Sequence, residues 1–147
     1  KKLPTFGINK GFGNVEFLIL VIIWETSFNL MLLILISCLY FNYGLLLESK
    51  KNIKDAINLY LEAIKYFPKD PNFYNKLALI YKRQGKFKDA KDLFLNSIYI
   101  DSNFEFGYIN LANLYLDLGK NEKAEEIYKK VLFWKSKFKC GISKKKI

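Results

Sequence analysis

A period of 34 residues constrains the fold of this chain more than any other feature of its sequence. Tyrosine recurs at that interval, at Tyr40, Tyr74 and Tyr108. Alanine recurs at the same interval, at Ala56, Ala90 and Ala124. A repeat of this length cannot bury its apolar face alone, so neighbouring copies have to stack. The period therefore predicts three stacked units, at residues 37–70, 71–104 and 105–138.

Within each unit, large apolar residues recur at intervals of three and four in two separate stretches. Positions 4, 7, 8 and 11 form one stretch, and positions 20, 24 and 27 form the other. Residues at this spacing share one face of a helix, so each unit is predicted to be a hairpin of two helices. Position 8 always holds a small residue, Gly44, Ala78 or Ala112, which lets the two helices cross closely. Gly85 and Gly119 fall between the paired helices of the second and third units, where the first unit has Lys50-Lys51.

These units resemble tetratricopeptide repeats, which combine a small residue at position 8, an aromatic residue at 11, alanine at 20 and an aromatic residue at 24. The resemblance implies an all-α fold, a right-handed superhelical array of three hairpins preceded by the N-terminal hydrophobic helix. It also implies a concave groove lined by positions 2, 5, 6, 9, 12 and 13 of the first helices. From these positions we select as peptide-groove candidates Asn42, Asn75, Lys76, Leu79, Arg83, Asn110 and Asn113.

The candidates suggest how an extended peptide would be held. An asparagine amide both donates and accepts hydrogen bonds, so Asn75, Asn110 and Asn113 could pair with a peptide backbone. Lys76 and Arg83 would favour a carboxylate beside them. Some members of the family clamp a terminal carboxylate with lysine and asparagine at five fixed positions. Here those positions hold Phe41, Leu45, Lys76, Phe106 and Asn110. A more apolar or internal segment of a partner protein is therefore expected.

Residues 17–36, after an N-terminal tail of residues 1–16, are apolar and long enough to cross a bilayer, which takes about 20 residues. Glu25 opposes this, because a charged residue at the bilayer centre costs on the order of 2.5 to 3.5 kcal/mol. We predict a membrane anchor at residues 17–36. The lysines that follow it would keep the repeats on the untranslocated face, cytosolic or stromal. The alternative is a pair of short helices packed on the array, with a turn at Glu25.

Little in the sequence indicates chemistry. The chain has no histidine, and its two cysteines are about 100 residues apart, Cys38 expected as a buried small residue and Cys140 in the tail. We therefore predict no catalytic, cofactor or metal site and no enzyme. The formal charge of +10 is the excess of 24 basic over 14 acidic residues, and Arg83 is the one arginine. This lysine excess is typical of AT-rich genomes, and without a reader motif it does not indicate nucleic-acid binding.

The C-terminal end of the array is predicted to lack a capping helix. Trp134 is expected to close the last helix and Gly141 to prevent a further one, leaving residues 139–147 as a basic tail that includes Lys144, Lys145 and Lys146. Without a polar cap, a terminal repeat exposes apolar surface. Tyr128, Val131, Leu132 and Trp134 are the residues concerned. A partner, self-association through this last repeat, or the tail would cover them.

These features together predict a membrane-anchored, non-catalytic scaffold that holds another protein during assembly of a membrane complex. The architecture resembles the plastid and cyanobacterial tetratricopeptide proteins implicated in photosystem I assembly. That resemblance implies a thylakoid membrane, repeats facing the stroma and a subunit of the complex as partner. Two alternatives stay open, a soluble or peripheral cytoplasmic adaptor from an AT-rich organism and a fragment of a larger repeat-containing enzyme.

Overall fold

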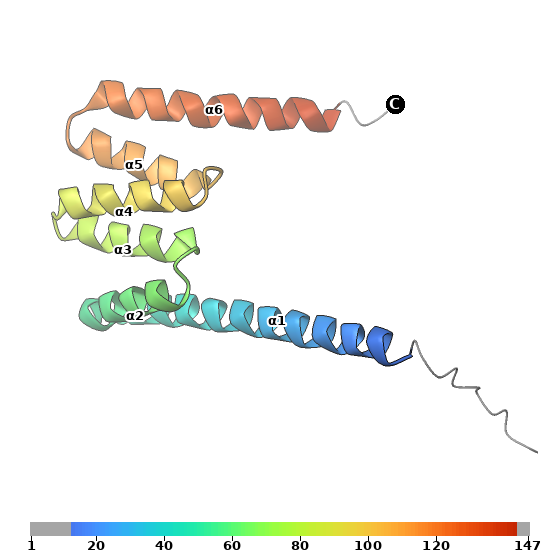
Figure 1. Cartoon of the computed structure of the whole chain (residues 1–147). Helices are drawn as coiled ribbons and strands as arrows, with labels where there is room; N and C mark the ends of the chain where they lie inside the picture. Colours follow the sequence, from blue (N-terminus) through green and yellow to red (C-terminus); the bar gives the residue numbers. More distant parts are fainter. Residues whose placement is uncertain (1–12, 144–147) are drawn as a thin grey trace, which may run out of the picture. The chain divides into compact units, whose positions relative to one another are not determined.

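The computed structural model describes the backbone of residues 13–143 and the side chains of residues 18–136. Residues 1–12 of the expected N-terminal tail, and Lys144, Lys145 and Lys146 of the basic tail, lie outside the described residues. The described residues contain six helices and no strand, which confirms the all-α fold class (Figure 1). The helices are α1 (Gly13–Ser49), α2 (Ile53–Tyr66), α3 (Pro71–Arg83), α4 (Phe87–Ile100), α5 (Glu105–Asp117) and α6 (Asn121–Ser143). The chain divides into two compact units, residues 1–39 and 40–147.

The described part of the first unit is the apolar portion of α1. Among the described residues, Leu18–Ser49 is the one helical stretch long and apolar enough to cross a membrane. Its most apolar segment has a mean hydropathy of 2.3, and no residue of that segment is buried. The expected alternative of two short helices with a turn at Glu25 is wrong, because α1 continues through Glu25 without interruption. Thr26 fits inside the helix because its hydroxyl donates to the carbonyl of Ile23, at 3.0 Å. Cys38 was expected to be buried but is an exposed free thiol.

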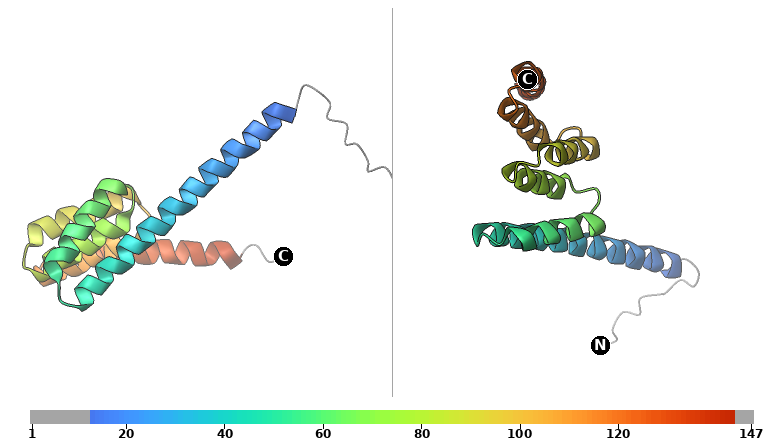
Figure 2. Two further views of the ribbon diagram at one scale, coloured as in Figure 1. Left: turned by 90° about the horizontal axis from the view of Figure 1, so that it is seen from below. Right: turned by 90° about the vertical axis from the view of Figure 1, so that its left-hand side faces the viewer.

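The second unit is a stack of helix hairpins, in which each helix packs on the next one along the chain. Helix α2 contacts α3, α3 contacts α4, α4 contacts α5, and α5 contacts α6. Helix α3 also contacts α5, so the first helices of successive repeats lie next to each other. Figures 1 and 2 show α3 to α6 as successive layers of this stack.

Small residues at the helix crossings let aromatic side chains fill the core between the repeats. The repeated alanines Ala56, Ala90 and Ala124 are fully buried. Tyr60 is fully buried as well, and its ring lies against Gly44 of the facing helix. The ring centroids of Tyr60 and Phe67 lie 6.3 and 6.1 Å from that of Phe73, the first aromatic residue of the next repeat; these contacts join the first two repeats.

The three turns inside the hairpins share one backbone conformation. Gly85 and Gly119 have φ of 76° and 69°, in the left-handed region where glycine ends a helix without strain. Lys51, at the equivalent position of the first repeat, has φ of 59°. A side chain in this region costs roughly 1 kcal/mol or more. The repeat geometry therefore imposes the turn even where the sequence lacks the preferred residue.

Between the first and second repeats, Asp70 and Pro71 begin the new hairpin. The Asp70 carboxylate accepts a hydrogen bond from the backbone N–H of Asn72 at 3.0 Å, and Pro71 stands in the first turn of α3, where its missing N–H costs nothing.

The last helix is longer than expected. Helix α6 runs to Ser143, so the prediction that Trp134 closes the last helix is wrong, and Gly141 lies inside this helix instead of after it. One glycine costs a helix only about 1 kcal/mol relative to alanine, and no proline follows it here. The Trp134 ring packs edge-on against Tyr108, with centroids 4.9 Å apart. Val131, expected to be partly exposed, is buried because it faces α5, whereas Leu132 is 65% exposed.

Candidate functional site

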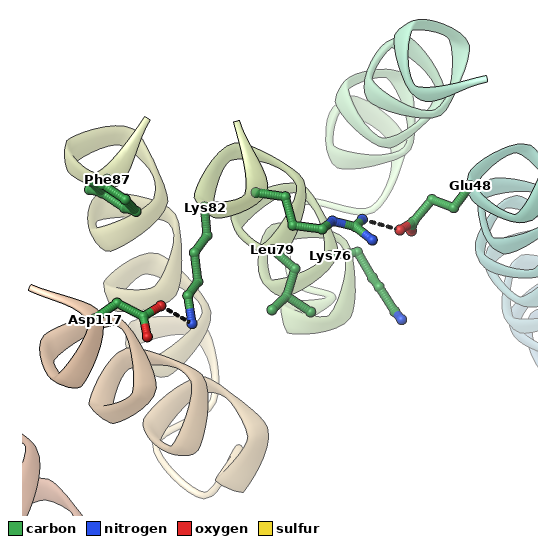
Figure 3. Close-up of a pocket in the computed structure, with 7 residues that line it drawn as sticks. Glu48, Lys76, Leu79, Lys82, Phe87 and Asp117 are labelled. Carbon is green, nitrogen blue, oxygen red and sulfur yellow. Dashed lines mark hydrogen bonds and ion pairs between the residues drawn. The ribbon is translucent and has the colours of Figure 1, made fainter. Parts of the chain in front are cut away.

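The first helices of the three repeats supply most of an open groove of about 570 Å³. Glu48 comes from α1, four residues come from α3, Phe87 begins α4 and Asp117 ends α5 (Figure 3). The lining residues are Glu48, Lys76, Leu79, Lys82, Arg83, Phe87 and Asp117.

Polar pairs connect the first helices of neighbouring repeats along this groove. Lys82 and Asp117 form an ion pair of 2.7 Å between α3 and α5, and Arg83 and Glu48 form one between α3 and α1 (Figure 3). Each pair joins position 12 of one repeat to position 13 of the next. The two ion pairs have opposite polarity. Position 12 supplies the acidic residue, Glu48, between the first and second repeats, and the basic residue, Lys82, between the second and third. Both carboxylates of the groove are therefore neutralised by the chain itself.

Glu48 has a second partner inside the first hairpin. The Tyr60 hydroxyl donates to its Oε1 at 3.0 Å. Burial raises the pKa of Tyr60, and the neighbouring Glu48 carboxylate raises it further. The side chain of Glu48 is only 15% exposed, compared with 59% for that of its partner Arg83. It is thus a fixed part of the groove wall and not a group that a ligand would readily displace.

Lys76 is the groove cation that keeps its charge available. Its Nζ lies 5.4 Å from the centre of the Phe41 ring, close enough for an attraction to the ring face. Among the described residues no carboxylate forms an ion pair with Lys76, whereas Lys82 and Arg83 each have one as a partner. With three bases and two acids in the lining, the groove carries one net positive charge, and that charge is located on Lys76.

The asparagine candidates are mostly engaged with other side chains. Asn75, only 7% exposed, accepts a hydrogen bond from Nδ2 of Asn110 at 2.9 Å, which links α3 to α5. Asn113 accepts one from the Tyr128 hydroxyl of the same hairpin. One donor or acceptor of each amide is therefore used within the array. Asn42 is exposed on α1 and does not line the groove.

Of the seven candidates, the groove brings together Lys76, Leu79 and Arg83. Phe87 was missed because it belongs to the second helix of its hairpin, whereas the repeat pattern assigns groove positions to the first helices alone. No signal in the sequence distinguishes it from the other aromatic residues. Among the side chains of residues 18–136, no group of three histidine, cysteine, aspartate or glutamate residues could hold a metal ion.

The stacked hairpins and their groove define the chain as an all-α repeat protein. A family model described as TPR repeat matches residues 44–85, and one described as tetratricopeptide repeat matches residues 71–104 and 107–137. Together they cover more than half of the chain, which therefore belongs to the tetratricopeptide-repeat family. Proteins of this family are in general non-catalytic scaffolds for protein–protein interaction. No curated protein sequence matches the chain significantly.

Solved structures with the same fold include peptide complexes. The second TPR domain of Spaghetti (RPAP3) bound to the HSP90 peptide SRMEEVD is 18% identical, with a TM-score of 0.60 over 66% of this chain and 90% of that one. The TPR2B domain of yeast Sti1 in complex with pHsp70 is 23% identical, with a TM-score of 0.60 over 65% and 76%. MamA is 24% identical, with a TM-score of 0.62 over 67% and 57%. At these identities the likeness shows the fold.

Proposed function

We propose that this protein is a non-catalytic, membrane-anchored scaffold whose groove holds an extended segment of a partner protein. The observation that carries the proposal is Lys76, a cation without a carboxylate partner among the described residues, in the wall of an open groove beside Leu79. A peptide that offers an acidic side chain next to an apolar one fits this pair. The peptide SRMEEVD bound by the Spaghetti domain contains both kinds of residue, which supports a partner of this chemistry.

The groove selects such a peptide partly through its own ion pairs. Because Glu48 and Asp117 are already paired with Arg83 and Lys82, an incoming acidic residue meets little repulsion from them. An incoming basic residue finds both carboxylates taken and meets the charge of Lys76. Asn110 and Asn113 lie on α5 outside the lining of the groove. We infer that their remaining hydrogen-bonding groups pair with the backbone of a longer peptide that continues along α5.

The anchor is the apolar part of α1, residues 17–36. A helix rises about 1.5 Å per residue, so 20 residues span the roughly 30 Å of a hydrocarbon core. The 14 Leu, Ile, Val and Phe residues of this segment favour insertion by about 4 to 8 kcal/mol in total, which exceeds the cost of Glu25, about 3 kcal/mol. The large side chains between Leu18 and Leu35 are exposed, as a lipid-facing helix requires.

We infer further that the partner is a subunit of a membrane complex, with photosystem I as the specific candidate. A single N-terminal apolar helix followed by three repeats supports this, since the plastid and cyanobacterial assembly proteins share that arrangement. The repeats would then face the stroma from a thylakoid membrane.

The peptide proposal is tested by titrating fluorescent peptides into the purified chain. A peptide with an acidic residue next to a leucine should bind, and Lys76→Glu should weaken it about tenfold or more, because a charge-assisted contact is replaced by repulsion. Lys88→Glu is the matched control, because Lys88 is exposed on α4 outside the groove. Equal affinities for the two variants would refute the role of Lys76.

The anchor is tested separately by washing native membranes in alkaline carbonate. Retention of the chain in the pellet is expected, and co-purification of photosystem I subunits would identify the complex. Release into the supernatant would refute the anchor and favour a soluble adaptor.

A further inference from the structure

Two polar residues inside the apolar part of α1, Glu25 and Asn29, share one face of the helix. Glu25 and Asn29 are four residues apart, so their side chains lie next to each other on the helix. Neither forms a hydrogen bond or ion pair with another described residue, whereas Thr26 bonds to its own helix. In a bilayer, a carboxyl and an amide without partners are costly. This face of α1 therefore requires a hydrogen-bonding partner from outside the chain's described residues.

A second anomaly lies further along the same helix. Tyr43 and Leu46 are large apolar residues of the first repeat, and they are 53% and 46% exposed. The residues at the same two positions of the second and third repeats are 0 to 4% exposed; they are Leu77, Ile80, Leu111 and Leu114. Those four are covered because α3 and α5 each pack on the second helix of the preceding repeat. Within the described residues no repeat precedes the first one, so no described residue fills its half of this interface.

The two anomalies share one spacing along the sequence of α1. Intervals of four and three residues lead from Glu25 and Asn29 through Leu32, Ile36 and Leu39 to Tyr43 and Leu46. Apolar residues repeating every 3.5 residues on average form the seam along which two helices pair in a left-handed coiled coil. A polar residue within such a seam fixes the register and number of helices.

We propose that this seam pairs with the same seam of a second copy, so that the protein is a parallel homodimer along α1. The inference rests on the proposed membrane anchor, because a shared membrane orientation makes the two helices parallel. Glu25 of one copy then lies at the same depth in the bilayer as Glu25 of the other copy, and the same holds for Asn29. The amide of one copy donates to the carboxyl group of the other, and the arrangement is complementary to itself. A different partner protein would have to carry matching polar groups at this depth.

Disulfide cross-linking in vesicles of phosphatidylcholine tests the pairing. The full chain carries Cys38→Ser and Cys140→Ser and one new cysteine, at Leu32 in the seam or at Ile34. Ile34 is two residues on, about 200° around the helix, and serves as the matched control. Oxidation of the Leu32→Cys chain should give a covalent dimer in several-fold higher yield than oxidation of the Ile34→Cys chain. Equal yields would overturn the proposed seam.

The polar pair is tested in the Leu32→Cys chain by replacing both Glu25 and Asn29 with leucine. The dimer yield should fall several-fold, whereas Ser27→Leu, on the opposite face, should leave it unchanged. An unchanged yield in the double variant would overturn the role of the polar pair.

Flotation of the same vesicles separates this inference from the proposed anchor. Chains that float with the lipid but do not cross-link would overturn the dimer and leave the anchor standing. Chains that fail to float would overturn both, because without a bilayer the polar pair needs no partner.

Discussion

Replacement of Gly44 by alanine tests whether the tight crossing in the first hairpin depends on the absence of a side chain. An added Cβ would lie 2.5 Å from Cζ and 2.6 Å from the hydroxyl oxygen of Tyr60, well inside van der Waals contact. The ring has little freedom to move, because it is fully buried, lies against Phe73 and donates a hydrogen bond to Glu48. The substitution should therefore strain the core.

Two effects of opposite sign set the magnitude. Alanine favours a helix over glycine by about 1 kcal/mol, whereas overpacking a well-filled core costs typically about 1 to 3 kcal/mol. We expect a net loss of about 1 kcal/mol in the free energy of unfolding. Urea denaturation in mild detergent, followed by far-ultraviolet circular dichroism, measures this difference.

A double-mutant cycle isolates the cause. In a Tyr60→Leu background the clash is absent, so Gly44→Ala should stabilise the chain by its helix propensity alone, about 1 kcal/mol. If Gly44→Ala stabilises the unmodified chain equally, the reasoning is refuted. The Tyr60 ring would then adapt to a methyl group as the third repeat does, where Ala112 and Tyr128 occupy the equivalent positions.

Three further predictions each concern a single residue. Asn75→Ala should cost about 1 to 2 kcal/mol in urea denaturation, because it leaves the Asn110 amide without its acceptor at the junction of α3 and α5. Tyr60→Phe should lower the free energy of unfolding at neutral pH by about 1 kcal/mol but raise the pH of alkaline unfolding. Burial raises the pKa of Tyr60, so the stabilisation that its neutral hydroxyl gives is complete below the ordinary pKa of 10.0 and is lost as the pH rises above it. Gly85→Ala should cost about 1 kcal/mol, because its φ of 76° disfavours a side chain although the surrounding space is open; thermal unfolding that is unchanged would contradict this.

The repeat pattern predicted most of the fold. The 34-residue interval predicted helix hairpins because positions three and four apart share a helical face, and α2 to α5 follow that pattern. The end of α6 was not predictable in this way. Gly141 resembles a helix stop in sequence, but a single glycine is a small penalty in a helix that is otherwise favourable.

The groove was predicted less completely than the fold. Lys76, Leu79 and Arg83 line it, as positions of the first helices should. The sequence did not reveal that Arg83 pairs with Glu48, or that Asn75 pairs with Asn110, because each pair joins residues 35 apart. Each pair joins the first helices of two neighbouring repeats, so the choice of partner depends on how far one repeat is displaced against the next.

The sequence by itself determined the class of fold, the apolar N-terminal helix and the absence of histidine chemistry, because periodicity and composition are local properties of a chain. Only the tertiary structure decided which charges of the groove remain available. Stacking brings Lys82 to Asp117 and Arg83 to Glu48, and it leaves Lys76 over an aromatic ring without a carboxylate among the described residues. Charge neutralisation depends on distances of a few ångströms between helices, and no spacing along the chain fixes those distances.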